Sequence, residues 1–316
     1  MGRGIAHAFA YAGHEVLLVD AKERDAASAG RLAAEAIAEV DASLAMLASL
    51  GAFDDAERPR IVERIRFVAR SDAPAALERA DIVFEGVPEV IDAKREAFGW
   101  ACAHLRPEAT VASTTSTMLS TELAAFVSHS ERFLNAHWLN PAYLVPLVEL
   151  SPHPGTAPTA LARMKALLES IGKVPVVCAA APGFIVPRMQ ALMMNEAARM
   201  IEQGVASPAD IDRAVRWGLG FRYANMGVVE FIDVGGLDIL FYASRYLTQS
   251  TGDTRYASPP IVDEHMRAGR DGLRSGRGFY DWTGIDVPAF RRETLGRQVA
   301  LLRQHGMFKP PGRSQV

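Results

Sequence analysis

The stretch MGRGIAHAFAYAGHEVLLVD, residues 1–20, decides the fold class of this chain. It sets Gly2 and Gly4 before an apolar helical segment, which leads into a short strand ending at Asp20. A glycine turn before a helix leaves N–H groups free for a pyrophosphate, and a carboxylate after the next strand can hold an adenosine ribose. This order predicts an α/β domain that binds a dinucleotide through Gly2 and Asp20. Taken alone, however, a Gly-x-Gly sequence before a helix is explained about as often by ordinary helix capping.

The front half of this dinucleotide fingerprint is absent from the 316 residues. A complete fingerprint has a strand and two more glycines before Gly2, and that strand is central in the strand order 3-2-1-4-5-6. We therefore expect a sheet in which two inner edges face each other unpaired. We also expect a form with roughly a dozen more residues at its start, a strand of ~5–6 plus a glycine turn, to bind the dinucleotide better.

Short apolar runs alternate with helical patterns over residues 1–181. Their β-branched residues are typical of strands buried on both faces, which predicts a Rossmann-type, mostly parallel α/β sheet. The Ala-rich segment 23–63 is too long for one crossover helix, so we expect a helical hairpin there. The predicted strands cover residues 15–20, 64–69, 81–86, 110–114, 132–137, 144–150 and 173–178.

A second, all-α domain is expected after Pro182 and Gly183, where the strand signals stop. Three segments beyond this point have helical periodicity and begin or end at Ser, Pro or Gly. They are residues 189–204, 207–218 and 236–248. We predict a Rossmann domain over residues 1–181 and a helical substrate and dimerisation domain over residues 182–316. The first of the three helical segments is apolar over more than one stripe, which favours a homodimer.

The composition is typical of a globular protein, with 49% hydrophobic residues, 22% charged residues and a net charge of -3. There is no basic block, so we expect neither nucleic acid nor a membrane as a partner. Cys102 and Cys178 are too few for a disulfide framework, which favours a reducing, cytoplasmic compartment. No apolar run reaches the ~20 residues of a membrane span, and nothing predicts a metal site.

His137 and Glu149 are the candidate residues for acid–base chemistry. Oxidising a secondary alcohol needs a group that takes the hydroxyl proton while hydride leaves the carbon, and imidazole, with a pKa of about 6.5, suits this task. His137 ends one predicted strand, and Glu149 lies twelve residues later on the next. A carboxylate bonded to the far ring nitrogen fixes the tautomer and stabilises the imidazolium. When the two residues are considered alone, His137 is more often a packed core histidine and Glu149 a surface carboxylate.

A set of short motifs runs along almost the whole chain. They are MGRGIA (1–6), EGVPEVIDAK (85–94), ASTTS (112–116), HWLNP (137–141), LVEL (147–150), PGFIV (182–186) and GRGFYDW (276–282). In this order and spacing they resemble the L-3-hydroxyacyl-CoA dehydrogenase family, which includes 3-hydroxybutyryl-CoA and L-gulonate 3-dehydrogenases. The resemblance implies NAD as cofactor and His137 and Glu149 as the catalytic pair. It also implies that Ser116 hydrogen-bonds the substrate oxygen, and that Met1 falls inside the glycine loop.

The resemblance gives roles to further residues, each of which has a structural alternative. Glu89 and Lys94 match positions that line the nicotinamide pocket, but a solvated pair at the start of a helix is a second interpretation. Ser116 is also a candidate helix cap. Asn140 matches an asparagine that orients His137 or the substrate, and its Asn-Pro sequence is equally consistent with a simple turn.

Two departures from the family pattern bear on the substrate. Most of the family has an asparagine after PGF-x-x, where this chain has Pro187, which has no donor in its side chain or backbone. Pro187 can instead begin a helix, where a missing N–H is harmless. Either Ser116 and water then serve the substrate oxygen, or the substrate differs from a plain acyl-CoA. Segment 218–233 resembles the gulonate dehydrogenase branch, and its Arg222 is either a bidentate anchor for a substrate carboxylate or a surface or interface arginine.

We expect NAD-dependent oxidation of a short 3-hydroxyacyl-CoA, such as 3-hydroxybutyryl-CoA, to the 3-ketoacyl-CoA. Asp20 favours NAD over NADP because its carboxylate repels a 2′-phosphate, while Lys22 and Arg24 act against this preference. The first alternative is a dehydrogenase of a small free 3-hydroxy acid anchored by Arg222. The second is a catalytically silent structural or binding homologue, which Pro187 and the absent first strand favour and the intact catalytic residues oppose.

Overall fold

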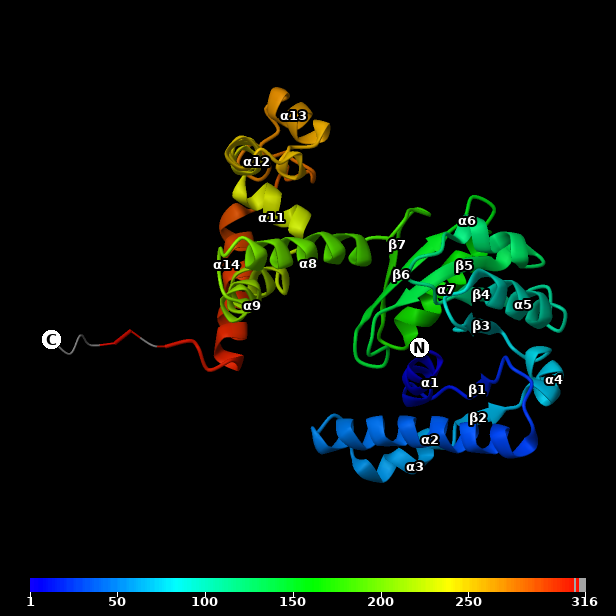
Figure 1. Cartoon of the computed structure of the whole chain (residues 1–316). Coiled ribbons are helices and arrows are strands. Elements are labelled where there is room, and N and C mark those ends of the chain that lie inside the picture. Colours follow the sequence, from blue (N-terminus) through cyan, green and yellow to red (C-terminus); the bar gives the residue numbers. More distant parts are fainter. Residues whose placement is uncertain (310, 313–316) are drawn as a thin grey trace. The chain divides into compact units, whose positions relative to one another are not determined.

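The structure, a computed structural model, describes residues 1–309 and 311–312 and has two compact units (Figure 1). The first unit comprises Met1–Asn195 and the second Glu196–Val316, so their division falls inside one helix, α8 (Val186–Glu202). The domain limits suggested by the sequence, residues 1–181 and 182–316, stay a prediction. No helix within the described residues is long and apolar enough to cross a membrane.

Seven strands form in the first unit, one at each stretch where the sequence predicts one. They are rich in Val, Ile, Leu and Phe, whose branched or bulky side chains pack well on a pleated surface. The strands are β1 (Val16–Val19), β2 (Ile65–Val68), β3 (Ile82–Glu85), β4 (Thr110–Ser113), β5 (Phe133–Trp138), β6 (Leu147–Pro152) and β7 (Val174–Val177).

The strands are divided between two sheets and are parallel with one exception. β1 pairs with β2, and the other five strands form a sheet in the order β3-β4-β5-β6-β7. The exception is the antiparallel pair of β5 and β6, so the expectation of a mostly parallel sheet is confirmed. The segment between these two strands, residues 139–146, is too short for the crossover of a dozen or more residues that a parallel connection needs.

The two sheets are separated where the central strand of a 3-2-1-4-5-6 order would lie, as the sequence predicts. Among the described residues, β1 pairs only with β2 and β3 pairs only with β4. A cavity of about 2010 Å³ is lined by both β1 and β3. It also reaches Gly2, Asp20 and Gly86, which lie at the carboxyl ends of the strands.

The predicted hairpin over residues 23–63 forms with a long first arm and a short second arm. The second arm has only five residues, with Pro59 in its first turn, and β2 follows at Ile65. The helices of the first unit that precede α8 are α1 (Gly2–Tyr11), α2 (Ala26–Ser49), α3 (Arg58–Val62), α4 (Ala73–Leu77), α5 (Ile91–Cys102), α6 (Ser120–Leu123) and α7 (Pro158–Ser170).

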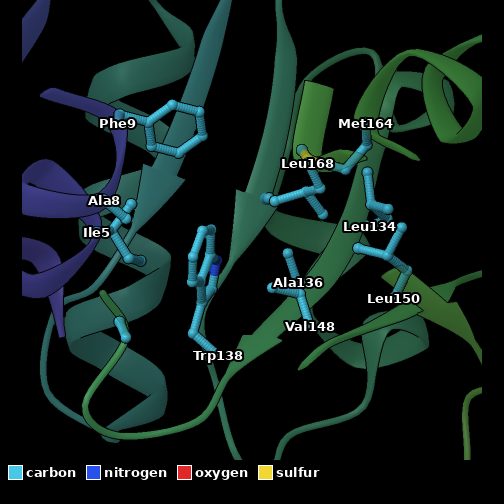
Figure 2. Packing of buried hydrophobic residues seen from close by; sticks show 12 residues of the cluster. Ile5, Ala8, Phe9, Leu134, Ala136, Trp138, Val148, Leu150, Met164 and Leu168 are labelled. Atoms are coloured by element: carbon cyan, nitrogen blue, oxygen red, sulfur yellow. The ribbon is translucent and has the colours of Figure 1, made fainter. Parts of the chain in front are cut away.

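Adjacent residues of the five-stranded sheet face opposite layers of the core. Leu134 packs in a cluster with residues of α1 and α7, and Trp138 lies in the same cluster beside Phe9 (Figure 2). The neighbouring Phe133 packs on the other side, against Phe98 of α5. The sheet is therefore covered on both faces, as the apolar runs predict.

The second unit is helical, and one buried carboxylate organises its GRGFYDW motif. Asp233 is 0% exposed and accepts the backbone N–H groups of Phe279 at 3.0 Å and Tyr280 at 2.8 Å, and the Trp282 indole N–H at 2.8 Å. A Cβ at Gly278 would lie 2.3 Å from this carboxylate, so the position requires glycine. The remaining helices are α9 (Pro208–Ala214), a π-helix (Val215–Gly220), α10 (Phe221–Tyr223), α11 (Val228–Gly235), α12 (Leu237–Thr251), α13 (Pro260–Arg267) and α14 (Val287–Gln304).

Candidate active site

His137 and Glu149 lie directly opposite each other on β5 and β6. Directly opposed residues of an antiparallel pair project their side chains to the same face. Nδ1 of His137 is 2.7 Å from Oε2 of Glu149. Their exposed fractions are only 7% and 1%. The antiparallel pairing of β6 is therefore what joins the two predicted catalytic residues.

The second carboxylate oxygen of Glu149 is held by the turn that begins α8. Oε1 accepts the backbone N–H groups of Ile185 at 2.9 Å and Val186 at 2.8 Å, which would otherwise lack partners at a helix start. The chain reaches this geometry through left-handed backbone at Gly183 (φ 75°) and Phe184 (φ 45°). The Phe184 ring also stacks on His137, with 5.4 Å between ring centroids. The PGFIV motif thus fixes both members of the pair.

Ser116 follows β4, the strand that lies parallel to β5. Ser116 is exposed, and its backbone N–H donates to Oε1 of Glu89 at 2.9 Å. Oε2 of Glu89 lies 3.2 Å from Nζ of Lys94, in the first turn of α5. Since Lys94 is only 1% exposed, the interpretation of Glu89 and Lys94 as a solvated pair is wrong. The structure thus joins Ser116, Glu89 and Lys94 in one network.

The carboxyl edge of β1 and β3 carries the residues predicted for the dinucleotide. A Cβ at Gly86 would lie 3.5 Å from the backbone nitrogen of Gly2, an ordinary van der Waals distance, so the residue after β3 lies against the start of α1. Within the described residues, α1 has no side-chain cap at its N-terminus. Asp20 is 9% exposed and accepts the backbone N–H of Lys22 at 3.0 Å and Nε of Arg24 at 2.6 Å.

Three further predicted residues are Asn140 after β5, Pro187 in α8 and Arg222 in the second unit. Asn140 is exposed, three residues after His137 on the chain, and it precedes a cis peptide bond to Pro141. Pro187 is in the first turn of α8, as expected for a proline that begins a helix. Arg222 belongs to the second unit, where its guanidinium lies 5.3 Å from the centroid of the Phe231 ring.

Comparison with known proteins decides the family. Residues 1–181 match the family described as "3-hydroxyacyl-CoA dehydrogenase, NAD binding domain", and residues 183–282 match "3-hydroxyacyl-CoA dehydrogenase, C-terminal domain". The chain belongs to the 3-hydroxyacyl-CoA dehydrogenase family.

Relatives with different names cover almost the whole chain. A 3-hydroxybutyryl-CoA dehydrogenase of Bradyrhizobium diazoefficiens is 34% identical over 284 residues, which are 90% of this chain and 92% of the relative. A 5-formyl-3-hydroxy-2-methylpyridine 4-carboxylate 5-dehydrogenase of Mesorhizobium japonicum is 32% identical over 304 residues, or 96% and 94% of the two chains. The crystal structure of a 3-hydroxyacyl-CoA dehydrogenase from Archaeoglobus fulgidus matches with a TM-score of 0.74 and 30% identity, covering 98% and 96%.

As a member of the 3-hydroxyacyl-CoA dehydrogenase family, the chain is an oxidoreductase with an NAD-binding domain. The residues at the carboxyl edge fit this cofactor. Gly2 and Gly86 line the cavity at the start of α1, whose first N–H groups have no side-chain cap among the residues that the structure describes and are suited to bind a pyrophosphate. The carboxylate of Asp20 has the acceptor chemistry that a ribose diol needs.

Sequence reasoning missed two parts of this 3-hydroxyacyl-CoA dehydrogenase site. The first is Glu85, whose carboxylate lies 3.0 Å from Nζ of Lys94. Its signal was a lone carboxylate at the end of an otherwise apolar strand. The second is the pair of amides from Ile185 and Val186 on Glu149, and backbone groups leave no residue-type signal.

Proposed function

We propose that the protein oxidises the 3-hydroxyl group of a short 3-hydroxyacyl-CoA, such as 3-hydroxybutyryl-CoA, to the ketone, with NAD as the oxidant. The observation that carries this proposal is the His137–Glu149 pair, a buried imidazole bonded to a carboxylate whose other oxygen is already occupied by two amides. Such a pair is suited to remove a proton and return it.

In the proposed reaction, each residue acts on a defined bond. Nε2 of His137 takes the hydroxyl proton, and Glu149 stabilises the resulting imidazolium through Nδ1. The Ser116 hydroxyl donates a hydrogen bond to the substrate oxygen, where negative charge develops. NAD, when bound, would supply the acceptor for the hydride that leaves the carbon as the C=O bond forms. The position of Ser116 beyond the carboxyl end of β4, next to β5, supports this assignment.

The assignment of NAD contacts to Gly2, Asp20, Glu89 and Lys94 is part of the same proposal. Asp20 is placed to accept from a ribose hydroxyl and to repel a 2′-phosphate. Asn140 is proposed to orient the substrate or His137 from the loop after β5. These assignments rest on the resemblance together with the common carboxyl edge of the parallel strands.

A small free 3-hydroxy acid is the second candidate substrate, with Arg222 as the anchor for its carboxylate. Arg222 is exposed and lies against Phe231, so its guanidinium is oriented and open to a ligand. The relative from Mesorhizobium japonicum is named for a pyridine carboxylate, which is not a CoA thioester. Pro187 adds to this candidate because it removes a side-chain donor that most of the family uses. A silent homologue is disfavoured by the intact His137–Glu149 pair.

A homodimer in the cytoplasm is also proposed. Helix α8, all of which the structure describes, has no buried residue and exposes Met189, Leu192 and Met194 by 49%, 65% and 62%. An exposed apolar face of this kind favours association with a second copy. A monomeric mass by light scattering at micromolar concentration would contradict the dimer. Both cysteines are free, which fits a reducing compartment.

A substrate panel tests the function. We expect NAD reduction with short 3-hydroxyacyl-CoA thioesters and a much lower kcat/KM with free 3-hydroxy acids. The variant Arg222→Leu distinguishes the two classes, since loss of a charged bidentate contact costs ~2–5 kcal/mol. If the substrate is a 3-hydroxyacyl-CoA, the KM of this variant should stay that of the wild type. If the substrate is a free 3-hydroxy acid, its KM should rise. No NAD reduction with any thioester would contradict the first candidate.

A further inference from the structure

One carboxylate oxygen gathers the donors of the loop that follows β4. Oε1 of Glu89 accepts the backbone N–H groups of Ser116 at 2.9 Å and Thr117 at 3.2 Å, and the Thr117 hydroxyl at 3.0 Å. The Thr115 hydroxyl donates to the same oxygen, and Thr115 Oγ1 accepts the N–H of Met118 at 2.9 Å. Glu89 therefore fixes the backbone on both sides of Ser116 and leaves the Ser116 hydroxyl outside this clamp.

The other oxygen of Glu89 is held by a buried ammonium. Nζ of Lys94 lies 3.2 Å from Glu89 Oε2 and 3.0 Å from both carboxylate oxygens of Glu85. Glu85 is fixed in turn by the Ser113 hydroxyl at 2.6 Å and the Val87 N–H at 2.7 Å. A buried charge is tolerated only when it is paired and hydrogen-bonded, and Lys94 meets both conditions.

The charge of Glu89 is maintained by these partners. Burial raises the pKa of Glu89, but the Thr115 hydroxyl and the Lys94 ammonium outweigh burial and bring the pKa down to about 2. The carboxylate is therefore ionised at neutral pH, and ionised acceptors make the stronger hydrogen bonds. Without Lys94, the carboxylates of Glu85 and Glu89 would repel each other, and Glu89 would move away from the loop.

We propose that Lys94 and Glu89 are positioning residues for Ser116, in addition to any contact with the cofactor. Lys94 holds Glu89, and Glu89 holds the loop so that the Ser116 hydroxyl meets the substrate oxygen beside His137. The inference rests on the proposed function because it takes Ser116 to bind that oxygen. Replacing Lys94 should therefore slow the reaction because it displaces the Ser116 hydroxyl from the substrate oxygen.

Hydrogen exchange tests the clamp without any measurement of activity. In Lys94→Met and in Glu89→Gln, we expect the amides of Ser116 and Thr117 to exchange at least about tenfold faster than in the wild type. The control is Arg95→Gln, a charge removal on the same helix, where Arg95 pairs with Asp92 at the surface. Its exchange in this loop should match the wild type.

Glu89→Gln keeps the pair of Lys94 and Glu85, so it carries the test if Lys94→Met fails to fold. Unchanged exchange of the Ser116 and Thr117 amides in Glu89→Gln, read from peptides that span residues 113–118, would overturn the clamp.

Kinetics with 3-hydroxybutyryl-CoA and NAD test the link to Ser116. Lys94→Met should lower kcat by about 10- to 100-fold, the size of effect that a misplaced group causes. At saturating NAD, where a loss of cofactor affinity is compensated, the same change in a Ser116→Ala background should lower kcat by less than about threefold, because the group that Lys94 positions is already gone. A merely structural lysine would lower kcat equally in both backgrounds, and that result would overturn the inference. If the wild type oxidises none of the panel substrates, the proposed function fails, and hydrogen exchange still decides the clamp.

Discussion

Nδ1 of His137 lies 2.7 Å from Oε2 of Glu149, which leaves Nε2 as the ring nitrogen that can face a substrate. Glu149 cannot turn away from the ring without losing the amides of Ile185 and Val186 on its other oxygen. The imidazole orientation is therefore set before any substrate arrives. Catalytic groups that are held in advance lose little free energy to reorganisation during the reaction.

His137→Ala should abolish turnover and leave the cofactor site intact. General acid–base catalysis contributes ~10²–10⁴-fold, so kcat should fall by about that factor. NAD affinity, measured by calorimetry, should stay within a few-fold of the wild type because the cofactor residues lie on other elements. Activity within a few-fold of the wild type would remove His137 from the mechanism.

The turn before α8 should be as important for turnover as for stability. Gly183 has φ 75°, and a Cβ there would lie 3.3 Å from Cβ of Arg188. Gly183→Ala should cost about 1–2 kcal/mol in stability through the left-handed backbone. It should also lower kcat by up to about 10²-fold, because a shifted turn releases Glu149. Thermal unfolding and steady-state kinetics measure the two effects.

Gly172→Ala is the matched control for this prediction. Gly172 has φ 76°, and no atom lies within 4 Å of its added Cβ, so the backbone cost is the same without a contact to the pair. Its kcat should equal that of the wild type. An equal loss of kcat in both variants would show that general destabilisation, and not the Glu149 clamp, lowers turnover.

The strands and the contact between His137 and Glu149 could be predicted because they depend on residue type and spacing. β-branched runs mark buried strands, and His137 and Glu149 stand at family spacing on two consecutive strands. Of the network around Lys94, the sequence indicated Glu89 and Lys94 but not Glu85 and Ser113. Whether a lysine five residues after a glutamate is solvated or buried depends on Glu85 and Ser113, which lie opposite each other on the neighbouring strands β3 and β4.

The cofactor preference should reside in Asp20 and its neighbour. Arg24 Nε lies 2.6 Å from Asp20 Oδ2, so the aspartate neutralises a guanidinium that could otherwise meet a 2′-phosphate. Asp20→Ala should lower kcat/KM for NAD and raise it for NADP, shifting the ratio by about tenfold or more. In the double variant Asp20→Ala/Arg24→Ala the gain with NADP should disappear. A ratio that Asp20→Ala leaves unchanged would place the ribose contact elsewhere.

His7 should make the fold lose stability in mild acid. It is 1% exposed, its Nδ1 lies 2.7 Å from Ser43 Oγ, and its ring stacks on Tyr143 with 4.2 Å between centroids. Burial, with a smaller effect of the Lys173 charge, lowers the pKa of His7 from 6.5 to about 4. Between these values the unfolded chain binds a proton that the folded chain does not, so the free energy of unfolding falls as the pH drops.

The loss attributed to His7 should total at most about 3 kcal/mol and should be complete below about pH 4. It can be measured by urea unfolding at several pH values. His7→Gln removes this titration and should flatten the dependence between pH 6.5 and 4. His14→Gln, a change at an exposed histidine, should keep the dependence of the wild type. The same slope in His7→Gln as in the wild type would assign the effect to other groups.

The space between β1 and β3 should accept one more parallel strand. The cavity of about 2010 Å³ is lined by all four residues of each strand, and Met1 and Gly2 also line it. Each facing edge has backbone N–H and C=O groups that a strand between them would pair. A segment fused to Met1 would also bring a glycine turn to the start of α1, where a pyrophosphate is expected to bind.

We therefore predict that an added N-terminal segment of about six apolar residues and a Gly-x-Gly turn raises both stability and NAD affinity. Two new ladders and the burial of apolar edges should raise Tm by several degrees at least, and NAD should bind about tenfold tighter or more. The control is the same extension with prolines at alternate positions, which cannot donate ladder hydrogen bonds. It should gain neither property. The same Tm and the same NAD affinity in the extended, proline-containing and 316-residue forms would show that the cavity does not hold a strand. The two sheets would then be stable as they stand, because α1 and the hairpin of α2 and α3 pack against β1 and β2.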